Sequence, residues 1–179
     1  MLKEKNIIGI QFFLNFIENS AELYSFLKDF VLWDERMKAR KTASFGEAYN
    51  YSQISYPFQE FPESLLNILN LIEENIGFKP NNCLINYYLD GNSKMGYHSD
   101  QTDILAENTG VVIISLGETR TIRFRNIANP EIKKEYQLPS GSLFYMTAEV
   151  QKEWQHAIPK KNTENGRMSL TFRKLLLEK

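Results

Sequence analysis

Two histidines and one aspartate carry the strongest chemical signal in this sequence. His98 and Asp100 lie two residues apart in the run GYHSD, and His156, the only other histidine, lies in the run WQHAIP. In an extended strand, residues two apart project to the same side. Such a pair, joined by a histidine from a distant strand, is the 2-His-1-carboxylate pattern that binds non-haem Fe(II) and leaves coordination positions open. We therefore expect the three side chains to converge, with donor atoms within about 4 Å of one another.

A polar strand face supplies the second signal. In the run RMSLTFR, a period of two separates polar from apolar side chains, with Arg167, Ser169, Thr171 and Arg173 opposite Met168, Leu170 and Phe172. Taken singly, an H-x-D pair more often reflects a hydrogen-bonded histidine, and a polar strand face is more often solvated. Their conjunction favours a site, because a dicarboxylate needs a two-pronged cation, which Arg167 supplies better than a lysine would.

Short β-rich runs separated by turn residues must position these side chains. Eight such runs follow residue 82: CLINYYL, MGYHSD, GVVIISLG, TIRFRNI, KEYQLP, GSLFYM, WQHAIP and RMSLTFRKLLL. Their number and spacing predict a β-sandwich or barrel, for which a jelly roll is the natural candidate. In CLINYYL, Asn86 and Tyr88 share a face, and a buried strand must satisfy their hydrogen bonds internally. This favours a barrel whose interior holds a polar ligand.

Helical signals are confined to the first half of the chain. Ser20 can cap a helix whose apolar stripe comprises Leu23, Phe26, Leu27 and Phe30. A second helix is predicted from Pro62 to Gly77, with a stripe of Leu65, Leu69, Ile72 and Ile76. The segment 37–58 between them has neither helical nor strand period and is predicted to be an ordered loop or hairpin.

These elements predict a mainly β protein with flanking helices, of the α+β class. We expect one domain over residues 1–179, in which 1–81 form N-terminal helices and a substrate lid and 82–179 form the jelly-roll core. The 21 basic and 22 acidic residues nearly cancel, so bulk charge does not demand a nucleic-acid partner.

The lone cysteine and the N-terminal segment predict where the protein works. One cysteine, Cys83, excludes an intramolecular disulfide and fits a reducing compartment. It lies among apolar strand residues and is predicted to be a core residue, not a nucleophile. The N-terminal run IIGIQFFLNFIENS is too short and too interrupted by polar residues to span a bilayer. We therefore expect a cytoplasmic protein without a membrane partner, and a monomer.

Four motifs in order resemble the AlkB family of 2-oxoglutarate- and Fe(II)-dependent dioxygenases: NYYLDGNSKMGYHSD, SLGETRTIRFR, WQHAIP and RMSLTFRKL. The resemblance covers roughly residues 36 to 175 and implies a double-stranded β-helix with iron held by His98, Asp100 and His156. It implies a 2-oxoglutarate site with five residues. Arg167 pairs with the distal carboxylate, Asn86 and Tyr88 hydrogen-bond the cosubstrate, Arg173 lies near its metal-bound end, and Ser169 stands where many members carry asparagine.

The resemblance also implies an activity. With O₂, members of this family convert 2-oxoglutarate into succinate and CO₂ while they hydroxylate a substrate C–H bond, and a hydroxylated N-methyl group leaves as formaldehyde. The run ARKTASFGEAYNYS is similar to the lid that recognises alkylated bases in DNA or RNA, which implies a flipped or single-stranded base near Arg40, Tyr49 and Tyr51. Candidate phosphate contacts are Lys38, Arg40, Lys41, Lys160 and Lys161.

One departure from the family leaves the substrate open. Repair members carry an acidic residue two positions after the iron aspartate, where this chain has Thr102, followed by Asp103. Either residue could contact a base, or the pocket could serve a small molecule or a protein side chain. In that second case, alanine at Arg40 and Tyr51 should leave activity unaffected. A binding module without catalysis is disfavoured, because no metal ligand and no cosubstrate arginine is missing.

Overall fold

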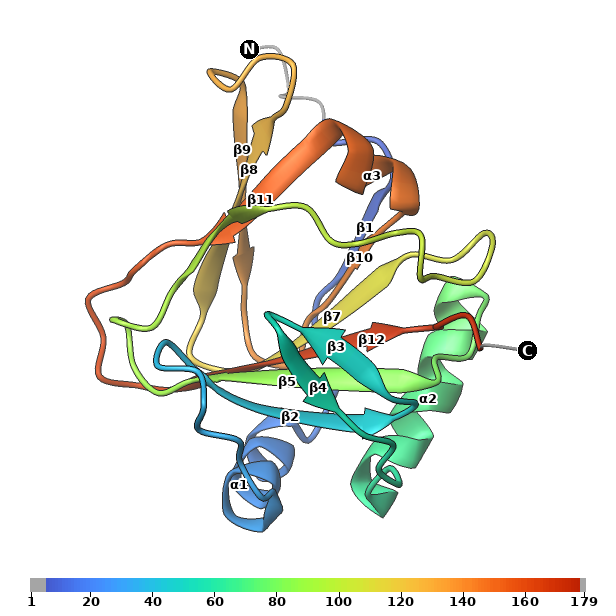
Figure 1. Ribbon diagram of the computed structural model, residues 1–179. Coiled ribbons are helices and arrows are strands. Elements are labelled where there is room, and N and C mark those ends of the chain that lie inside the picture. Colours follow the sequence, from blue (N-terminus) through green and yellow to red (C-terminus); the bar gives the residue numbers. More distant parts are fainter. Residues whose placement is uncertain (1–5, 178–179) are drawn as a thin grey trace.

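Two antiparallel sheets face each other in the computed structural model, which describes residues 6–177 (Figure 1). The larger sheet has the strand order β1-β10-β7-β12-β5-β2, and the smaller has the order β6-β11-β8-β9. The larger sheet comprises β1 (Ile10–Phe13), β2 (Lys41–Gly46), β5 (Asn82–Tyr88), β7 (Val111–Gly117), β10 (Leu143–Met146) and β12 (Arg167–Arg173). The smaller sheet comprises β6 (Met95–His98), β8 (Arg120–Asn126), β9 (Lys133–Leu138) and β11 (Trp154–Ile158).

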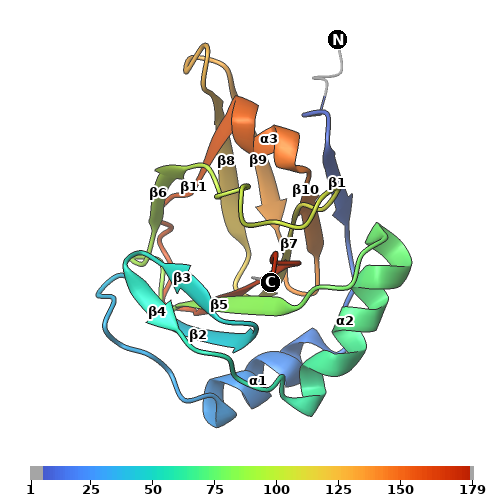
Figure 2. The same ribbon diagram turned by 45° about the vertical axis from the view of Figure 1, so that its right-hand side comes forward.

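Two of the three described helices cover the outer face of the larger sheet. Helices α1 (Ser20–Phe30) and α2 (Glu63–Ile76) lie below it, whereas α3 (Ala148–Glu153) leads directly into β11 (Figure 2). Gly77 ends α2 in the left-handed conformation, which glycine adopts without steric cost. Among residues 6–177, no helix is long and apolar enough to cross a membrane.

The mainly β jelly roll expected from the sequence is confirmed. Each of the eight β-rich runs after residue 82 forms a strand, because alternating or continuously apolar runs bounded by turn residues suit strands that are covered on at least one face. The helix expected before Gly77 is present, and its buried residues are Leu65, Ile68, Leu69 and Ile72.

The first helix differs in detail from the expectation. Ser20 is its first helical residue and Asn19 occupies the cap position, without a side-chain capping hydrogen bond. Leu23 and Leu27 are buried, but Phe26 and Phe30 are exposed and stack on each other with centroids 4.9 Å apart. The buried stripe is narrower than the apolar stripe, because the sheet offers contact to only one side of the helix.

The division of the chain at residue 81 was wrong for the sheet. Strand β1 pairs with β10 and β2 pairs with β5, so segments before residue 82 complete both edges of the larger sheet. The predicted hairpin is present as β3 (Tyr49–Tyr51) and β4 (Ile54–Tyr56), which lie in front of the space between the sheets (Figure 1). Strand β2, with the sequence KTASFG, was missed because its small and polar residues give no period-two signal.

The larger sheet separates two hydrophobic cores. On β5, Cys83 and Ile85 face the helices, whereas Leu84 and Tyr88 belong to the core between the sheets. Cys83 is fully buried, and burial raises the pKa of its thiol. The thiol is therefore an inert core group, as the sequence indicated.

Leu27 shows how much the helix layer contributes to stability. Its side chain is fully buried between α1 and the larger sheet, so Leu27→Ala should lower the free energy of unfolding by about 2–5 kcal/mol. Phe30→Ala on the same helix removes a larger side chain that is 66% exposed, and should cost about 1 kcal/mol or less. Urea denaturation of both variants measures the difference. Equal losses would mean that α1 does not pack as described.

Candidate metal centre and cosubstrate pocket

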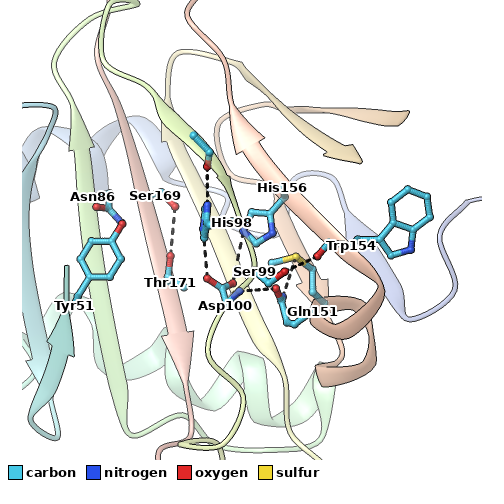
Figure 3. Close-up of polar contacts among 12 residues, drawn as sticks. Tyr51, Asn86, His98, Ser99, Asp100, Gln151, Trp154, His156, Ser169 and Thr171 are labelled. Atoms are coloured by element: carbon cyan, nitrogen blue, oxygen red, sulfur yellow. Dashed lines mark hydrogen bonds and ion pairs between the residues drawn. The ribbon is translucent and has the colours of Figure 1, made fainter. Parts of the chain in front are cut away.

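His98, Asp100 and His156 converge between the two sheets. His98 ends β6 directly opposite His156 on β11, and Asp100 follows β6 after one residue (Figure 3). The Nε2 atoms of His98 and His156 lie 3.6 and 3.7 Å from the two carboxylate oxygens of Asp100. One donor atom from each residue lies within 4.8 Å of the others. The three side chains converge as expected. Both histidine–aspartate distances are shorter than the expected 4 Å, whereas the limit that includes all pairs of donor atoms, 4.8 Å, is slightly longer.

The protonation states suit a cation at this point. Burial lowers the pKa of His156 to about 4, so its imidazole is neutral at physiological pH. Nδ1 of His98 lies 2.8 Å from the carbonyl oxygen of Gly96, so in the neutral ring Nδ1 carries the hydrogen and Nε2 offers a lone pair. Burial acts to raise the pKa of Asp100, but the two histidines and Arg173 outweigh it and hold that pKa below its ordinary value.

Three electron-pair donors therefore point at one spot. Burial acts to lower the pKa of His98, but its hydrogen bond with Asp100 and the carboxylate charge outweigh this and raise the pKa. Two imidazoles and one carboxylate are the donor set that suits a divalent transition metal.

Strand pairing brings the residues predicted to bind 2-oxoglutarate to the same cavity. On β5 and β12, Tyr88 lies opposite Arg167 and Asn86 lies opposite Ser169, so all four project into the space between the sheets. Together with Arg173 and the three candidate ligands, they line one pocket. The polar face of β12 is consequently not a solvated surface, since Arg167 is 1% exposed and Arg173 is 3% exposed.

The two buried arginines of β12 have unused hydrogen-bond donors that belong to the pocket lining. Arg167 donates from Nη2 to the hydroxyl of Ser115 at 2.9 Å, while its Nε and Nη1 have no partner among the described residues. Nε and Nη1 of Arg173 also lack partners there, and its Nη2 lies 3.6 Å from Asp100. Burial lowers the pKa of Arg167 to about 10, which leaves it charged at neutral pH. Buried, charged and unsatisfied groups are costly, so the pocket is built for an anionic ligand.

Several pocket residues were not singled out from the sequence. Thr171 lies beside Ser169 on β12, and the apolar wall consists of Leu84, Met95, Ile113, Ile122 and Ile158. The period of β12 had already placed Thr171 on the face of Arg167, but no role in the site was assigned to it. Arg120, also unpredicted, is fully buried and donates to the carbonyl oxygens of Ser93 and Pro159, both at 2.8 Å. It thereby ties the segment that follows β5 to the segment that follows β11, next to the ring of Tyr88.

Of the residues predicted to contact substrate, the two tyrosines lie at the pocket and the two loop residues after Asp100 do not. Tyr51 lines the pocket, and the buried Tyr49 stacks over the guanidinium of Arg173 at 5.0 Å. Thr102 and Asp103 do not line the pocket, although they lie on the loop that follows Asp100.

Arg40 is not a surface phosphate contact, because it is 8% exposed. It donates to Asn86 at 3.2 Å, to the Tyr51 hydroxyl at 3.0 Å and to the carbonyl oxygen of Lys94 at 2.6 Å. Its place next to strand β5 could not be read from a local sequence of basic residues. Arg40 therefore links the hairpin to the cosubstrate strand.

The four lysines predicted to contact phosphate differ in their partners. Lys41 pairs with Glu35 at 2.8 Å, and Lys161 pairs with Glu118 at 2.6 Å. Lys38 and Lys160 are exposed. The basic cluster is thus less available to a polyanion than its sequence indicated.

Comparison with known proteins agrees with this geometry. A family model described as the 2OG-Fe(II) oxygenase superfamily matches residues 24–173. The chain belongs to this superfamily. Membership implies Fe(II), 2-oxoglutarate and O₂ as cofactor, cosubstrate and oxidant, and the cluster of two histidines and an aspartate fits that set. The dioxygenase class expected from the motifs is confirmed at the level of the family.

Individual relatives of this 2OG-Fe(II) oxygenase carry AlkB names, which confirms the resemblance seen in the motifs. The rat alpha-ketoglutarate-dependent dioxygenase alkB homolog 3 is 32% identical over 163 residues, covering 80% of this chain and 55% of the relative. The human DNA oxidative demethylase ALKBH2 is 30% identical over 155 residues, covering 78% and 58%. The chain thus spans about half the length of these curated relatives.

The fold of this superfamily member also matches a solved structure. OsALKBH1 superposes with a TM-score of 0.70 at 15% identity, and the match covers 96% of this chain and 100% of that structure. At this identity the likeness concerns the fold alone, and it supports the two-sheet architecture described above.

Proposed function

We propose that the protein is an Fe(II)- and 2-oxoglutarate-dependent dioxygenase that removes N-alkyl groups from nucleobases in DNA or RNA. The observation that carries the proposal is a single pocket in which three metal-binding side chains face two buried arginines with unsatisfied donors. When bound, Fe(II) supplies the oxidation of a substrate C–H bond by O₂, coupled to conversion of 2-oxoglutarate into succinate and CO₂.

The chain's own residues would bind and orient the cosubstrate. His98, Asp100 and His156 would hold the iron from one side and leave its other coordination positions free. Arg167 begins β12, whose other end carries Arg173 next to Asp100, so its fork can pair with the carboxylate remote from the metal while Ser115 keeps the guanidinium in place. Asn86 and Tyr88 would contact the cosubstrate between these two ends.

The walls of the pocket would control water and the substrate. Apolar side chains of both sheets surround the metal-binding cluster, including Ile113 on β7 and Ile158 on β11. Such walls exclude water from the reacting C–H bond and prevent side reactions. Tyr51 on the hairpin would hold the substrate group at the pocket mouth. A hydroxylated N-methyl group then leaves as formaldehyde. At N1 of adenine or N3 of cytosine the electrons of the broken C–N bond return to the ring nitrogen as a lone pair, and the hydroxyl proton goes to solvent.

A nucleobase substrate has support from two sides. The relative human ALKBH2 is named a DNA oxidative demethylase. In this chain, Tyr49 and Tyr51 stack on each other with ring planes 15° apart on the hairpin over the pocket, and aromatic rings can stack an extruded base.

A panel of modified oligonucleotides tests the substrate class. With Fe(II), ascorbate and 2-oxoglutarate, the protein should demethylate N1-methyladenine or N3-methylcytosine, which mass spectrometry detects as loss of one methylene unit from the base. Ethenoadenine and matched single- and double-stranded forms define the range of substrates. His98→Ala is the inactive control. Absence of activity across the panel, while succinate is still released, would favour a small-molecule or protein substrate.

Arg40→Ala does not distinguish a nucleic-acid substrate from a small-molecule or protein substrate. Because Arg40 hydrogen-bonds Asn86, its loss should disturb cosubstrate binding whatever the substrate is. Lys38 and Lys160 are exposed, so Lys38→Ala and Lys160→Ala are cleaner tests of phosphate contact. A monomeric, cytoplasmic protein stays a prediction, which size-exclusion chromatography with light scattering tests for the oligomeric state.

A further inference from the structure

Gln151 makes a hydrogen bond that bears directly on the geometry of the metal centre. Its side-chain Oε1 accepts the backbone N–H of Asp100 at 2.8 Å, although the two residues are 51 positions apart (Figure 3). Gln151 lies on α3 and is only 4% exposed. Burying an amide costs free energy unless it is hydrogen-bonded, and an apolar residue would fill the same space at no such cost. The amide therefore has a task that packing alone does not require.

The role of the Gln151 amide is explained by where the pairing of β6 ends. Strand β6 ends at His98, and its pairing with β11 changes register between His156 and Ile158. Asp100 thus lies outside the ladder that fixes the two histidines relative to each other. A backbone N–H at this position needs another acceptor, and Gln151 supplies it.

The hydrogen bond also connects Asp100 to the strand of the third candidate ligand. Helix α3 ends at Glu153 and β11 begins at Trp154, two residues before His156. The hydroxyl of Ser99 donates to the carbonyl oxygen of Trp154 at 2.9 Å. Two hydrogen bonds therefore hold the Ser99–Asp100 segment against the junction of α3 and β11.

We propose that Gln151 is a positioning residue, which fixes the backbone of Asp100 and so aims its carboxylate at the two histidines. The inference rests on the metal centre of the proposed function and adds a residue that does not touch the metal. Groups that orient metal ligands usually contribute about 10- to 100-fold to metal affinity.

The other end of the Gln151 amide offers a matched control. Nε2 lies 3.5 Å from the sulfur of Met146, which is a weak acceptor. Gln151→Met keeps the length of the side chain but removes the acceptor for Asp100. Met146→Leu keeps the volume and removes only the sulfur contact. The pair separates an effect on Asp100 from an effect on packing.

Co(II) is a suitable probe, because it binds without substrate and its visible absorption reports coordination geometry. Gln151→Met should raise the dissociation constant for Co(II) by about 10- to 100-fold and change the absorption spectrum of the bound ion. Met146→Leu should bind Co(II) like the wild-type protein, with the same spectrum. The readout is titration of the purified protein, without measurement of turnover.

Each outcome separates this inference from the proposed function. If the wild-type protein does not bind Co(II), or if His98→Ala binds it equally well, the metal centre and the role of Gln151 both fail. If binding is normal and Gln151→Met matches the wild type in affinity and spectrum, only the role of Gln151 fails. Equal losses in Gln151→Met and Met146→Leu would also overturn it, since packing would then explain both.

A measurement on the wild-type protein covers the case in which Gln151→Met does not fold. The amide hydrogen of Asp100 should exchange slowly with solvent, although it lies beyond the end of β6. The backbone amide of Gln101, the next residue, serves as the comparison, since Gln101 is exposed. Equally fast exchange at both positions would show that Gln151 does not hold Asp100.

Discussion

Replacing Asp100 with alanine should abolish Fe(II)-dependent turnover of 2-oxoglutarate. Asp100 supplies the only carboxylate of the cluster, and its two oxygens lie 3.6 and 3.7 Å from the two histidine Nε2 atoms. Its loss removes one ligand and the negative charge that offsets a divalent cation. We expect metal affinity to fall by more than the roughly 100-fold that loss of an orienting neighbour causes. Succinate release and Co(II) titration measure the two effects separately.

Glu107→Ala is a matched control for Asp100→Ala. Glu107 is an exposed acidic residue on the loop that follows Asp100, outside the pocket. This variant should retain both succinate release and metal affinity. Normal turnover by Asp100→Ala would refute the metal centre, and with it the proposed reaction.

Replacing Arg167 with lysine should raise the apparent Michaelis constant for 2-oxoglutarate by about 10- to 100-fold. Lysine keeps the positive charge but cannot reproduce the paired N–H groups of the guanidinium. Hydrogen bonds to charged groups contribute about 1.5–3 kcal/mol each, which corresponds to this range. The turnover number at saturating 2-oxoglutarate should change much less, because Arg167 would bind the cosubstrate far from the iron. Initial rates over a range of 2-oxoglutarate concentrations separate the two constants.

Arg167→Met extends this prediction to stability. Arg167 is a buried cation with two unpartnered nitrogen atoms, so replacing it with an apolar side chain of similar length should not destabilise the ligand-free protein. 2-Oxoglutarate should raise the melting temperature of the wild-type protein, and this rise should be lost in Arg167→Met. Arg123→Lys is the control, because Arg123 is an exposed arginine paired with Glu135. It should alter neither the Michaelis constant for 2-oxoglutarate nor the turnover number. A wild-type Michaelis constant in Arg167→Lys would exclude the assigned role.

The alternation of polar and apolar residues along short segments predicted much of the fold and of the candidate site. Alternation along β12 placed Arg167 and Arg173 on one face, and the structure buries that face against the smaller sheet. The spacing of His98 and Asp100 predicted a shared direction, because side chains two apart on an extended chain project alike. Such features depend on a few neighbouring residues, so a single sequence contains them.

Features set by distant contacts could not be predicted in this way. The run of β2 has no strand period, and only its pairing with β5 makes it an edge strand. Arg40 has the local sequence of a surface cation, yet its partners lie on β5 and on the hairpin. Gln151 lies in a short helix with no motif, and its contact with Asp100 depends on how α3 meets the end of β6. In each case the tertiary partner decides the role of the residue.

The larger sheet separates residues that determine stability from residues that would determine activity. Its helix-facing side is an apolar layer with Leu27 and Cys83, whereas its inner side carries the buried polar groups that line the candidate site. Substitutions in the helix layer can therefore adjust thermal tolerance without touching the reacting atoms. The inner face and the hairpin can meanwhile diverge toward new substrates, provided that the outer layer keeps enough stability in reserve to absorb the cost. A laboratory that evolves this chain toward another substrate would gain by stabilising the α1 and α2 layer first.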